Sequence, residues 1–482
     1  MLLSSLIKGL KVIFVKGNTN IEISSISQNA NEENKNGLFL CYKGVNFDGH
    51  LAINKAIENG AVALVVERYI QNVKLPQVIV KNTRKIMHKI CNRFFNNPLK
   101  KIKVIGITGT NGKTTTCNIL KQILESANKK VGLIGTNGIE FDSKITTSNL
   151  TTPDTVVLFK TFSEMAKSNI EYVVMEVSAH ALDLFKVKGI KFEIGAFTNL
   201  TQDHLDYFSS MHKYALAKLK FLNKSYCKKC VINTDDSYGR LFYKLCNTNK
   251  TSYGIDETSE NFAINLDLQL NYSKFILNVF DNIFDVKTNF LCKFNVYNIL
   301  CAVVCSKLLG IDNDIIFKTI SSLKMVDGRM NLFNLKTQAK AVIDFAHTPD
   351  GLEKVLSGIR NLNKNSRLIT VFGCGGNRDK NKRALMGEIA YKLSDIVLLT
   401  SDNPRNENPI NIINNILAGI PCRNKVVIEG NRKKAIRKAV EISTKNDIIL
   451  LLGKGSEQTQ EINGVKYVYS DIEEIKQYIK KI

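Results

Sequence analysis

The 482-residue sequence has no tryptophan, only 7 prolines and no long apolar segment. Its longest purely apolar runs, such as Ala61–Val66 and Ile448–Leu452, are far shorter than the roughly 20 residues that span a bilayer. The first 16 residues are interrupted by Lys8, Lys11 and Lys16 and contain no small-residue cleavage site, so we expect no signal peptide. These absences predict a cytoplasmic protein that does not insert into membranes.

A disulfide framework is not expected either, because the 11 cysteines are scattered along a long chain. This distribution favours a reducing cytosol. Cys227 and Cys230 have the spacing of metal ligands, but no second pair of cysteines or histidines follows at zinc-finger distance. We therefore favour two thiols in a loop over a zinc site.

The formal net charge of +23 raises the question of a nucleic-acid or membrane partner. The lysines are spread along the whole chain among Asn and Ile residues, without a compact basic block or interleaved aromatic residues. A biased genome explains this distribution, and we expect no nucleic-acid partner. The basic field would still steer an acidic small molecule towards the protein.

The composition, with 44% hydrophobic and 23% charged residues, is typical of a globular protein with several domains. Alternating apolar strands and helical segments predict an α/β fold with three domains, over residues 1–98, 99–327 and 328–482. We expect a smaller N-terminal α/β domain, a central P-loop domain with a parallel sheet, and a doubly wound, Rossmann-like C-terminal domain. The expected strands lie at 12–15, 38–42, 63–66, 77–80, 103–108, 130–134, 172–175, 194–198, 230–233, 341–344, 368–372, 396–399, 425–428 and 448–452.

A glycine-rich turn between an expected strand and an expected helix is the sharpest local signal, and it reads Gly109-Thr110-Asn111-Gly112-Lys113-Thr114-Thr115. Backbone N–H groups in such a turn surround phosphate oxygens, and the helix N-terminus adds partial positive charge. Lys113 would reach the β- and γ-phosphates of ATP, and the Thr114 hydroxyl would ligate Mg²⁺. The strict motif has a glycine where this chain has Ile107, so we predict a variant phosphate-binding loop.

Two further residues are candidates for holding the metal. Glu176 ends a buried-type strand, and an acid at the end of a neighbouring strand is expected to help bind Mg²⁺. His204 follows the next strand at the same expected sheet edge, where it is a candidate second ligand. A structural histidine is the alternative.

Several segments resemble the Mur ligase family, whose members build the peptide stem of peptidoglycan. The resemblance extends over nearly the whole chain and is carried by residues 108–115, 175–178, 197–207, 344–350 and 372–380. It implies a monomeric, ATP- and Mg²⁺-dependent ligase that extends UDP-N-acetylmuramoyl-L-alanyl-D-glutamate by one amino acid. The substrates would be small molecules only.

The family resemblance also implies roles for individual residues. Lys218 occupies the place of a lysine that CO₂ converts to a carbamate, which can ligate Mg²⁺. The segments that contain Asn298 and Arg329 resemble family segments near the nucleotide. The UDP-dipeptide would be bound by Ser27, Val45, Asn46, Phe47, Thr151, Thr152, Ser178 and Lys186, the last of which is usually Arg in the family.

The added amino acid is predicted from Asp402-Asn403-Pro404-Arg405, which resembles the signature of the family branch that adds meso-diaminopimelate. Diaminopimelate is lysine with an additional carboxylate at its far end, and a guanidinium can bind that carboxylate through two parallel hydrogen bonds. Arg383 is the expected partner of Arg405. Gly453 and Glu457 would contact the distal ammonium and the backbone of the amino acid.

The implied mechanism begins with transfer of the γ-phosphoryl group of ATP to the D-glutamate side-chain carboxylate. The diaminopimelate amine then attacks the acyl phosphate. Three alternatives stay open: a sister ligase that adds lysine or extends folate, a nucleic-acid-stimulated ATPase, and a binding module without activity. The last is suggested by departures from the family pattern at Ile26, Gln28, Lys186 and Ser456.

Overall fold

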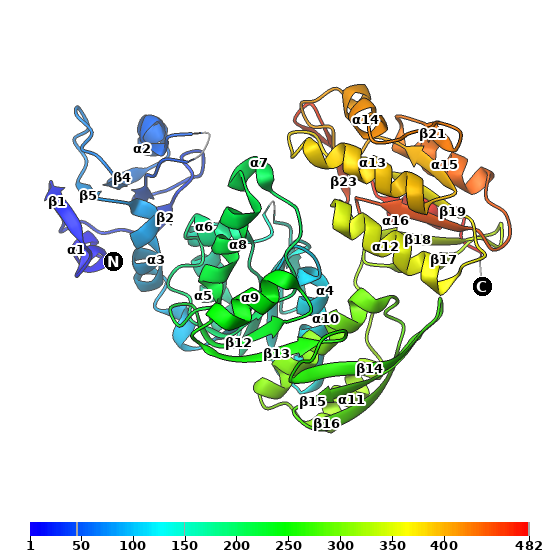
Figure 1. Ribbon diagram of the computed structural model, residues 1–482. Coiled ribbons are helices and arrows are strands. Elements are labelled where there is room, and N and C mark those ends of the chain that lie inside the picture. Colours follow the sequence, from blue (N-terminus) through cyan, green and yellow to red (C-terminus); the bar gives the residue numbers. More distant parts are fainter. Residues whose placement is uncertain (45–46, 149, 481–482) are drawn as a thin grey trace.

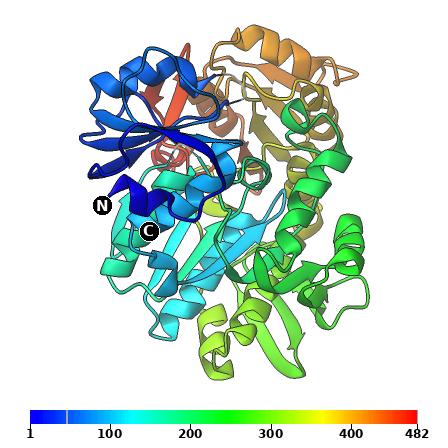
Figure 2. The same ribbon diagram turned by 90° about the vertical axis from the view of Figure 1, so that its left-hand side faces the viewer.

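The computed structural model describes residues 1–44, 47–148 and 150–480. Three sheets follow one another along the chain and lie in an arc (Figure 1). Seen after a quarter turn, the N-terminal part lies in front of the other two (Figure 2). Among the described residues, no helix combines the length and the apolar character needed to cross a bilayer.

The N-terminal part has one sheet of five strands, in the order β1-β5-β4-β3-β2. Its two faces are buried by separate apolar clusters, and the long helix α3 contributes Met87, Ile90 and Cys91 to one of them. The strands are β1 (Val12–Lys16), β2 (Ser25–Ser27), β3 (Gly37–Leu40), β4 (Ala61–Val66) and β5 (Gln77–Val80). The helices are α1 (Leu3–Ile7), α2 (Ile53–Glu58) and α3 (Thr83–Phe94), with short 3₁₀ turns at Gly49–Ala52 and Pro98–Lys100.

The central part has a mixed sheet in the order β16-β15-β14-β13-β12-β11-β6-β10-β7-β8-β9. Its parallel middle contains β6 (Lys103–Thr108), β7 (Val131–Gly135), β10 (Tyr172–Glu176), β11 (Phe192–Phe197), β12 (Cys227–Asn233) and β13 (Asn249–Gly254). These strands are buried on both faces, as their apolar sequences predict. The outer strands are β8 (Gly138–Phe141), β9 (Lys144–Thr146), β14 (Asn261–Leu268), β15 (Ser273–Val279) and β16 (Asn282–Thr288).

The outer strands add antiparallel pairs to the expected parallel sheet. β8 and β9 pair antiparallel on one edge, and β14, β15 and β16 do so on the other. Short connections join these neighbours, and short connections permit only antiparallel pairing. Helices cover both faces: α4 (Lys113–Ser126), α10 (Lys293–Leu308) and α11 (Asn313–Ser321) on one, and α5 (Thr155–Lys167), α6 (Ala179–Asp183), α8 (Met211–Leu219) and α9 (Ser237–Leu245) on the other, with α7 (Leu205–Phe208) beside them.

The C-terminal part is doubly wound around a sheet in the order β17-β18-β22-β19-β20-β21. Its strands are β17 (Asn331–Asn334), β18 (Lys340–Asp344), β19 (Leu368–Phe372), β20 (Ile396–Leu399), β21 (Val426–Ile428) and β22 (Ile448–Leu452). One face is covered by α12 (Pro349–Leu362), α13 (Asn381–Leu393) and α14 (Pro409–Leu417), and the other by α15 (Arg432–Glu441) and α16 (Asp471–Lys476). A separate hairpin is formed by β23 (Thr459–Ile462) and β24 (Val465–Val468). The domain boundaries near residues 98 and 327 stay a prediction.

A buried ion pair joins α15 to α16. The guanidinium of Arg432 donates to both carboxylate oxygens of Asp471, at 2.8 and 2.6 Å, and to Leu452 O at 2.9 Å. Both side chains are 0% exposed. Removing one partner of such a pair leaves an uncompensated buried charge, which is strongly destabilising.

We predict that Arg432→Ala lowers the free energy of unfolding by about 3–5 kcal/mol. The matched control is Arg437→Ala on the same helix, because Arg437 forms an exposed ion pair with Glu441 at 2.7 Å. Exposed pairs contribute about 0–1 kcal/mol. Denaturant unfolding of both variants checks the difference, and equal losses would contradict it.

Candidate active site

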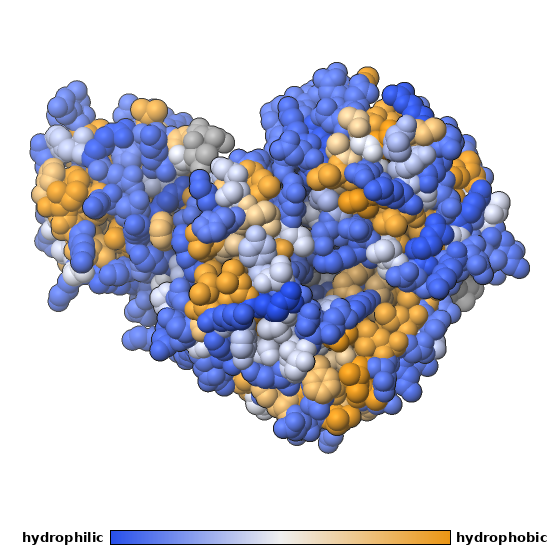
Figure 3. All heavy atoms as spheres, in the orientation of Figure 1, coloured by the Kyte–Doolittle hydropathy of each residue, from blue (hydrophilic) through white to orange (hydrophobic). Residues whose placement is uncertain are grey.

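A cavity of about 970 Å³ lies between the central and C-terminal parts. The molecular surface is visibly indented between these parts (Figure 3). The carboxyl ends of β6, β10 and β11 meet at the central side of this cavity, because these strands are parallel neighbours. On the C-terminal side the cavity is lined by α12 and by the loops that follow β18, β19, β20 and β22.

The glycine-rich turn lies between β6 and α4, as its sequence predicts. Gly109 and Gly112 have φ values of +155° and +85°, which side chains rarely permit. A Cβ atom at Gly112 would also collide with the amide oxygen of Asn298. Lys113 Nζ donates to Gly109 O and Thr110 O, both at 2.9 Å. The loop thus forms a concave, amide-lined surface at the N-terminus of a 14-residue helix.

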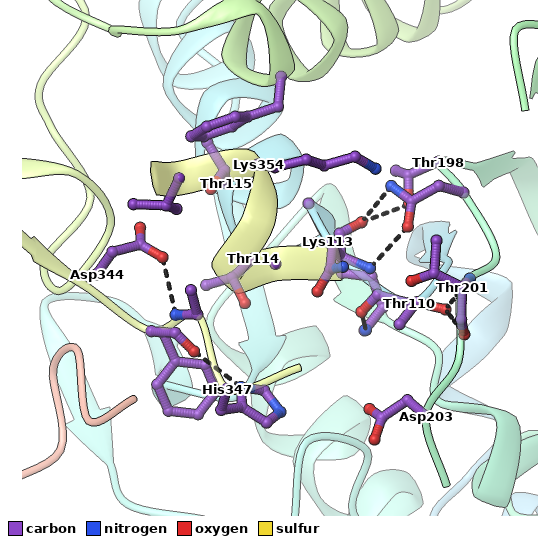
Figure 4. Close-up of a pocket in the computed structure, with 18 of the residues that line it drawn as sticks. Thr110, Lys113, Thr114, Thr115, Thr198, Thr201, Asp203, Asp344, His347 and Lys354 are labelled. Atoms are coloured by element: carbon purple, nitrogen blue, oxygen red, sulfur yellow. Dashed lines mark hydrogen bonds between the residues drawn. The ribbon is translucent and has the colours of Figure 1, made fainter. Parts of the chain in front are cut away.

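Thr114, Glu176 and Arg329 meet in one hydrogen-bonded group. Thr114 Oγ1 donates to Glu176 Oε1 at 2.9 Å and accepts from the Arg329 guanidinium at 3.1 Å. Thr136 N also donates to Glu176 Oε1, at 2.8 Å. Arg329 belongs to the segment just before β17, so this contact joins the C-terminal part to the phosphate-binding loop. Asn111 also lines the cavity, as do Thr110 and Thr115, which are labelled in Figure 4.

The hydroxyl and carboxylate of Thr114 and Glu176 are oxygen donors of the kind that Mg²⁺ prefers. Across the described residues, no group of three or more His, Cys, Asp or Glu side chains suits a metal. Mg²⁺ needs no such group, since it is commonly held by one or two protein ligands, substrate phosphates and water. The residues present therefore fit a Mg²⁺ ion that arrives with the nucleotide.

His204 and Asp203 lie at the same sheet edge and line the cavity. The distance between His204 Nε2 and Asp203 Oδ2 is 3.3 Å. Burial lowers the pKa of His204 to about 3, although the neighbouring Asp203 carboxylate opposes this shift. The imidazole is therefore neutral at physiological pH and keeps a lone pair that a metal can take.

Lys218 is buried on α8 and donates from Nζ to Gly109 O at 2.8 Å. Burial and the nearby Lys113 ammonium hold the pKa of Lys218 well below its ordinary value. A buried amine of this kind is a stronger nucleophile than an exposed lysine, because more of it is uncharged. The side chain lies behind the phosphate-binding loop rather than in the cavity lining.

The residues expected at the peptide end of the UDP-dipeptide lie around the end of β10. Thr151 Oγ1 is 3.2 Å from Thr136 Oγ1 and lines the cavity. Thr152 Oγ1 donates to Glu176 O at 2.8 Å and lies 3.2 Å from Ser178 Oγ. Lys186 Nζ is 2.7 Å from Asp154 Oδ1.

The residues expected at the UDP end belong to the N-terminal part. Ser27 is 3% exposed, and its hydroxyl donates to Asn29 O at 3.0 Å within its own loop. Phe47 is 54% exposed, with its ring centroid 5.6 Å from that of Tyr42. Neither lines the cavity. Val45 and Asn46 lie outside the described residues.

Asp402, Asn403, Arg405, Gly453 and Glu457 all line the C-terminal side of the cavity, whereas Pro404 does not. Asn403 Nδ2 donates to Glu457 Oε2 at 2.8 Å. The same carboxylate oxygen is 2.7 Å from the buried Lys454 ammonium. Arg405 donates from one terminal nitrogen to Gly376 O at 2.7 Å. The motif and the phosphate-binding loop therefore face one shared space.

Residues 19–107 match the Mur ligase family catalytic domain, residues 107–306 the Mur ligase middle domain, and residues 328–455 the glutamate ligase domain of Mur ligases. A protein of Clostridium acetobutylicum named UDP-N-acetylmuramoyl-L-alanyl-D-glutamate–2,6-diaminopimelate ligase 1 is 43% identical over 488 residues, covering 100% of both chains.

The chain belongs to the Mur ligase family. The diaminopimelate ligase of Aquifex aeolicus is 41% identical over 457 residues, covering 95% of this chain and 94% of its own. A solved structure of a UDP-N-acetylmuramoyl-L-alanyl-D-glutamate–2,6-diaminopimelate ligase superposes with a TM-score of 0.70 at 28% identity, covering 99% of this chain and 98% of the other. The fold predicted from the sequence is confirmed as a three-part Mur ligase architecture.

Arg383 was predicted to bind diaminopimelate together with Arg405, but in this Mur ligase it lies away from the cavity. Its side chain is 0% exposed and lies outside the cavity lining. The guanidinium donates to both carboxylate oxygens of Glu407, at 2.9 and 3.0 Å, and to Asn415 at 2.9 Å. It also reaches Gly375 O at 3.2 Å, so it stabilises the loop after β19 rather than facing a substrate. Arg378, five positions earlier in the sequence, lines the cavity instead.

Arg378 lines the cavity near Arg405, and sequence reasoning did not single it out. It lies in Gly375-Gly376-Asn377-Arg378, in the loop directly after β19. A Cβ atom built on Gly375 would lie 3.0 Å from an Arg405 nitrogen and 3.8 Å from Arg378 Cγ, so the two arginines approach each other. The rule that ligands bind at the carboxyl ends of parallel strands favours Arg378 over Arg383, which lies within α13.

Contacts across the cavity couple its two sides. Asn111 of the phosphate-binding loop donates to Asp350 of α12 at 2.9 Å, and Asp350 is 2.9 Å from Lys354 Nζ. Lys382 of α13 donates to His347 O at 3.0 Å and lies 3.9 Å from Asp203. Figure 4 shows Lys113, Asp203, His347 and Lys354 around the same space. A ligand in the cavity would therefore contact both parts.

We predict that Lys113→Ala weakens ATP binding by about 10- to 100-fold, because a hydrogen bond to a charged group contributes about 1.5–3 kcal/mol. Titration calorimetry with ATP and Mg²⁺ measures the change. Lys130→Ala is the control, since Lys130 is exposed beyond the far end of α4. Unchanged affinity in Lys113→Ala would contradict the assigned nucleotide site.

Proposed function

We propose that this Mur ligase adds meso-diaminopimelate to UDP-N-acetylmuramoyl-L-alanyl-D-glutamate, with conversion of ATP to ADP and phosphate, during synthesis of peptidoglycan precursors. The carrying observation is that Arg405 and Arg378 face the same cavity as the phosphate-binding loop. Relatives at 43% and 41% identity carry the name of this activity. A monomeric state and a cytoplasmic location stay predictions.

Phosphoryl transfer from ATP to the side-chain carboxylate of D-glutamate forms an acyl phosphate and releases ADP. Lys113 leaves its carbonyl partners and donates to the phosphate oxygens, where its charge offsets the charge that develops in the transition state. Thr114 and Glu176 would hold Mg²⁺, which neutralises phosphate charge when bound. Arg329, whose guanidinium lies 3.1 Å from Thr114 Oγ1, adds a further cation at this point.

Amide formation follows when the free amine of diaminopimelate attacks the acyl carbon. The N–C bond forms, phosphate leaves with its bridging oxygen, and the nitrogen loses a proton. Water at this point would hydrolyse the acyl phosphate, so it must be excluded. Contacts such as Asn111–Asp350 and Arg329–Thr114 join the two parts beside the cavity, which supports a reaction carried out between them.

The choice of amino acid follows from charge. Two guanidiniums beside one another can bind the distal carboxylate of diaminopimelate through several charge-assisted hydrogen bonds. Lysine would bring only an ammonium to the same place and would be repelled. Glu457 forms an ion pair with Lys454 and accepts a hydrogen bond from Asn403. Its proposed contact with the distal ammonium of diaminopimelate would be a third.

The deciding experiment incubates the protein with ATP, Mg²⁺, the UDP-dipeptide and diaminopimelate, lysine or glutamate in separate reactions, with product mass as readout. We expect a mass increase with diaminopimelate. A product formed only with lysine or glutamate would favour a sister ligase. ATP hydrolysis that rises with RNA or DNA but not with the UDP-dipeptide would refute the proposal.

We predict that Arg405→Ala reduces the preference for diaminopimelate over lysine by at least about tenfold, because charge-assisted hydrogen bonds to the distal carboxylate are lost. The ratio of kcat/KM for the two amino acids measures the preference. Arg437→Ala, an exposed substitution in the same part of the chain, should leave the ratio unchanged. An undiminished ratio in Arg405→Ala would refute the assignment of Arg405.

We predict that Lys218 reacts with CO₂ through its neutral amine, forming an N–C bond and releasing a proton to give a carbamate. Its burial and its position behind the phosphate-binding loop support this role. The carbamate should give a ¹³C NMR signal after incubation with ¹³C-labelled bicarbonate. That signal should disappear in Lys218→Arg, and its persistence there would rule out this residue.

A further inference from the structure

The hairpin β23–β24 is bonded to the loop that carries Arg405. Arg405 N donates to Glu461 O at 3.0 Å, and Asn463 N donates to Arg405 O at 2.7 Å. These bonds make a parallel β-bridge between Arg405 and Ile462. The Gln460 amide also donates to Asp402 O, at 2.6 Å. The loop is therefore braced by the hairpin along its main chain.

The backbone at Arg405 needs such a brace. Its φ of +52° lies in the left-handed region, which costs a residue other than glycine roughly 1–2 kcal/mol. Such a conformation persists only where the surroundings fix it, and it is found most often at functional sites. Here the hairpin bonds the N–H and the C=O of the strained residue. The hairpin therefore fixes the backbone of Arg405, and with it the direction in which the side chain leaves the loop.

The guanidinium of Arg405 is held on two sides by protein. One terminal nitrogen donates to Gly376 O at 2.7 Å, and Nε lies 3.4 Å from Glu461 Oε2. The side chains of Arg405 and Glu461 are 23% and 32% exposed, so this ion pair is half-buried. A guanidinium has five N–H groups in a rigid fork. With one terminal N–H bonded to Gly376 O and Nε facing Glu461, the remaining N–H groups of the fork can bind a carboxylate.

Glu461 also matters for the charge of the pair of arginines. The positive charges of Arg378 and Arg405 repel each other, which disfavours placing both guanidiniums in one site. Asp206, Asp203 and Glu461 all offset this repulsion at Arg378, and Glu461 is the one that also pairs with Arg405.

We propose that Glu461 is a positioning residue that holds the Arg405 guanidinium for the distal carboxylate of the incoming amino acid and so sets the preference for diaminopimelate over lysine. This inference rests on the proposed function. Glu461 acts through Arg405 and does not line the cavity itself. The Glu461–Arg405 ion pair joins a side chain of β23 to the loop 402–405. It adds to the main-chain hydrogen bonds between the hairpin and this loop.

The test uses Glu461→Gln, which keeps the size of the side chain and the main-chain bridge but removes the charge. We expect the KM for diaminopimelate to rise about threefold to fivefold, as for loss of a partly exposed ion pair to a substrate-binding arginine. The values of kcat and of KM for ATP should stay within about twofold. The preference over lysine should fall by the same factor as the KM rises. Glu461→Asp, which keeps the charge, should recover part of the loss.

Two controls separate positioning from stability. Glu388→Gln removes an exposed acid that pairs with Lys392 on α13 and should leave all these constants unchanged. In an Arg405→Ala background, Glu461→Gln should have no further effect on KM, because the residue through which it acts is gone. A further rise in that background, or an unchanged KM in the single variant, would overturn the inference.

A readout without catalysis distinguishes this inference from the proposed function. Phenylglyoxal modifies accessible arginines, and mass spectrometry gives the rate at each residue. We expect Arg405 to react several-fold faster in Glu461→Gln than in the unaltered protein, with Arg437 unchanged in both. An unaltered rate at Arg405 would refute the positioning role. Absence of product from diaminopimelate in the unaltered protein would instead refute the proposed function.

Discussion

The parallel pairing of β6 with β10 and β11 is the constraint on which the rest of the site depends. Because the three strands run in one direction, their carboxyl ends bring the phosphate-binding loop, Glu176 and His204 to one sheet edge. The Thr114–Glu176 hydrogen bond is the direct product of this pairing. Arg329 can then bond Thr114 from the C-terminal part, so the position of that part is tied to the same edge.

The strands at the centres of the sheets could be predicted because their continuous apolar sequences are typical of buried strands. The strands at 103–108, 368–372, 396–399 and 448–452 have the bounds that their apolar runs predict, since each run is bordered by polar or turn residues. The edges could not be predicted in this way. β14, β15 and β16 alternate polar and apolar residues, as half-exposed strands do, and they lack the continuous apolar character that marks the buried strands.

In the candidate site, too, some residues could be placed from the sequence and others could not. Lys113, Thr114 and Glu176 could be placed together from strand order alone, whereas the partner of Arg405 could not. Arg378 and Arg383 are five positions apart in one basic segment, and only the start of α13 at Asn381 decides which one points into a helix interface. Burial of Arg383 against Glu407 is a long-range contact that neither residue's neighbours in the sequence indicate.

The two halves of the site differ in how rigidly they can be specified, and the difference follows from where each lies. The phosphate-binding loop is fixed by a helix, a strand and glycine geometry, so its shape is local. The loop 402–405 has no such local support and carries a strained backbone at Arg405. Its shape is fixed instead by a hairpin more than fifty residues later in the chain, through main-chain bonds to Glu461 and Asn463. In the proposed function, selection of the amino acid is thereby separated from nucleotide binding, because the hairpin sets the direction of one guanidinium and, among the described residues, does not touch the phosphate-binding loop.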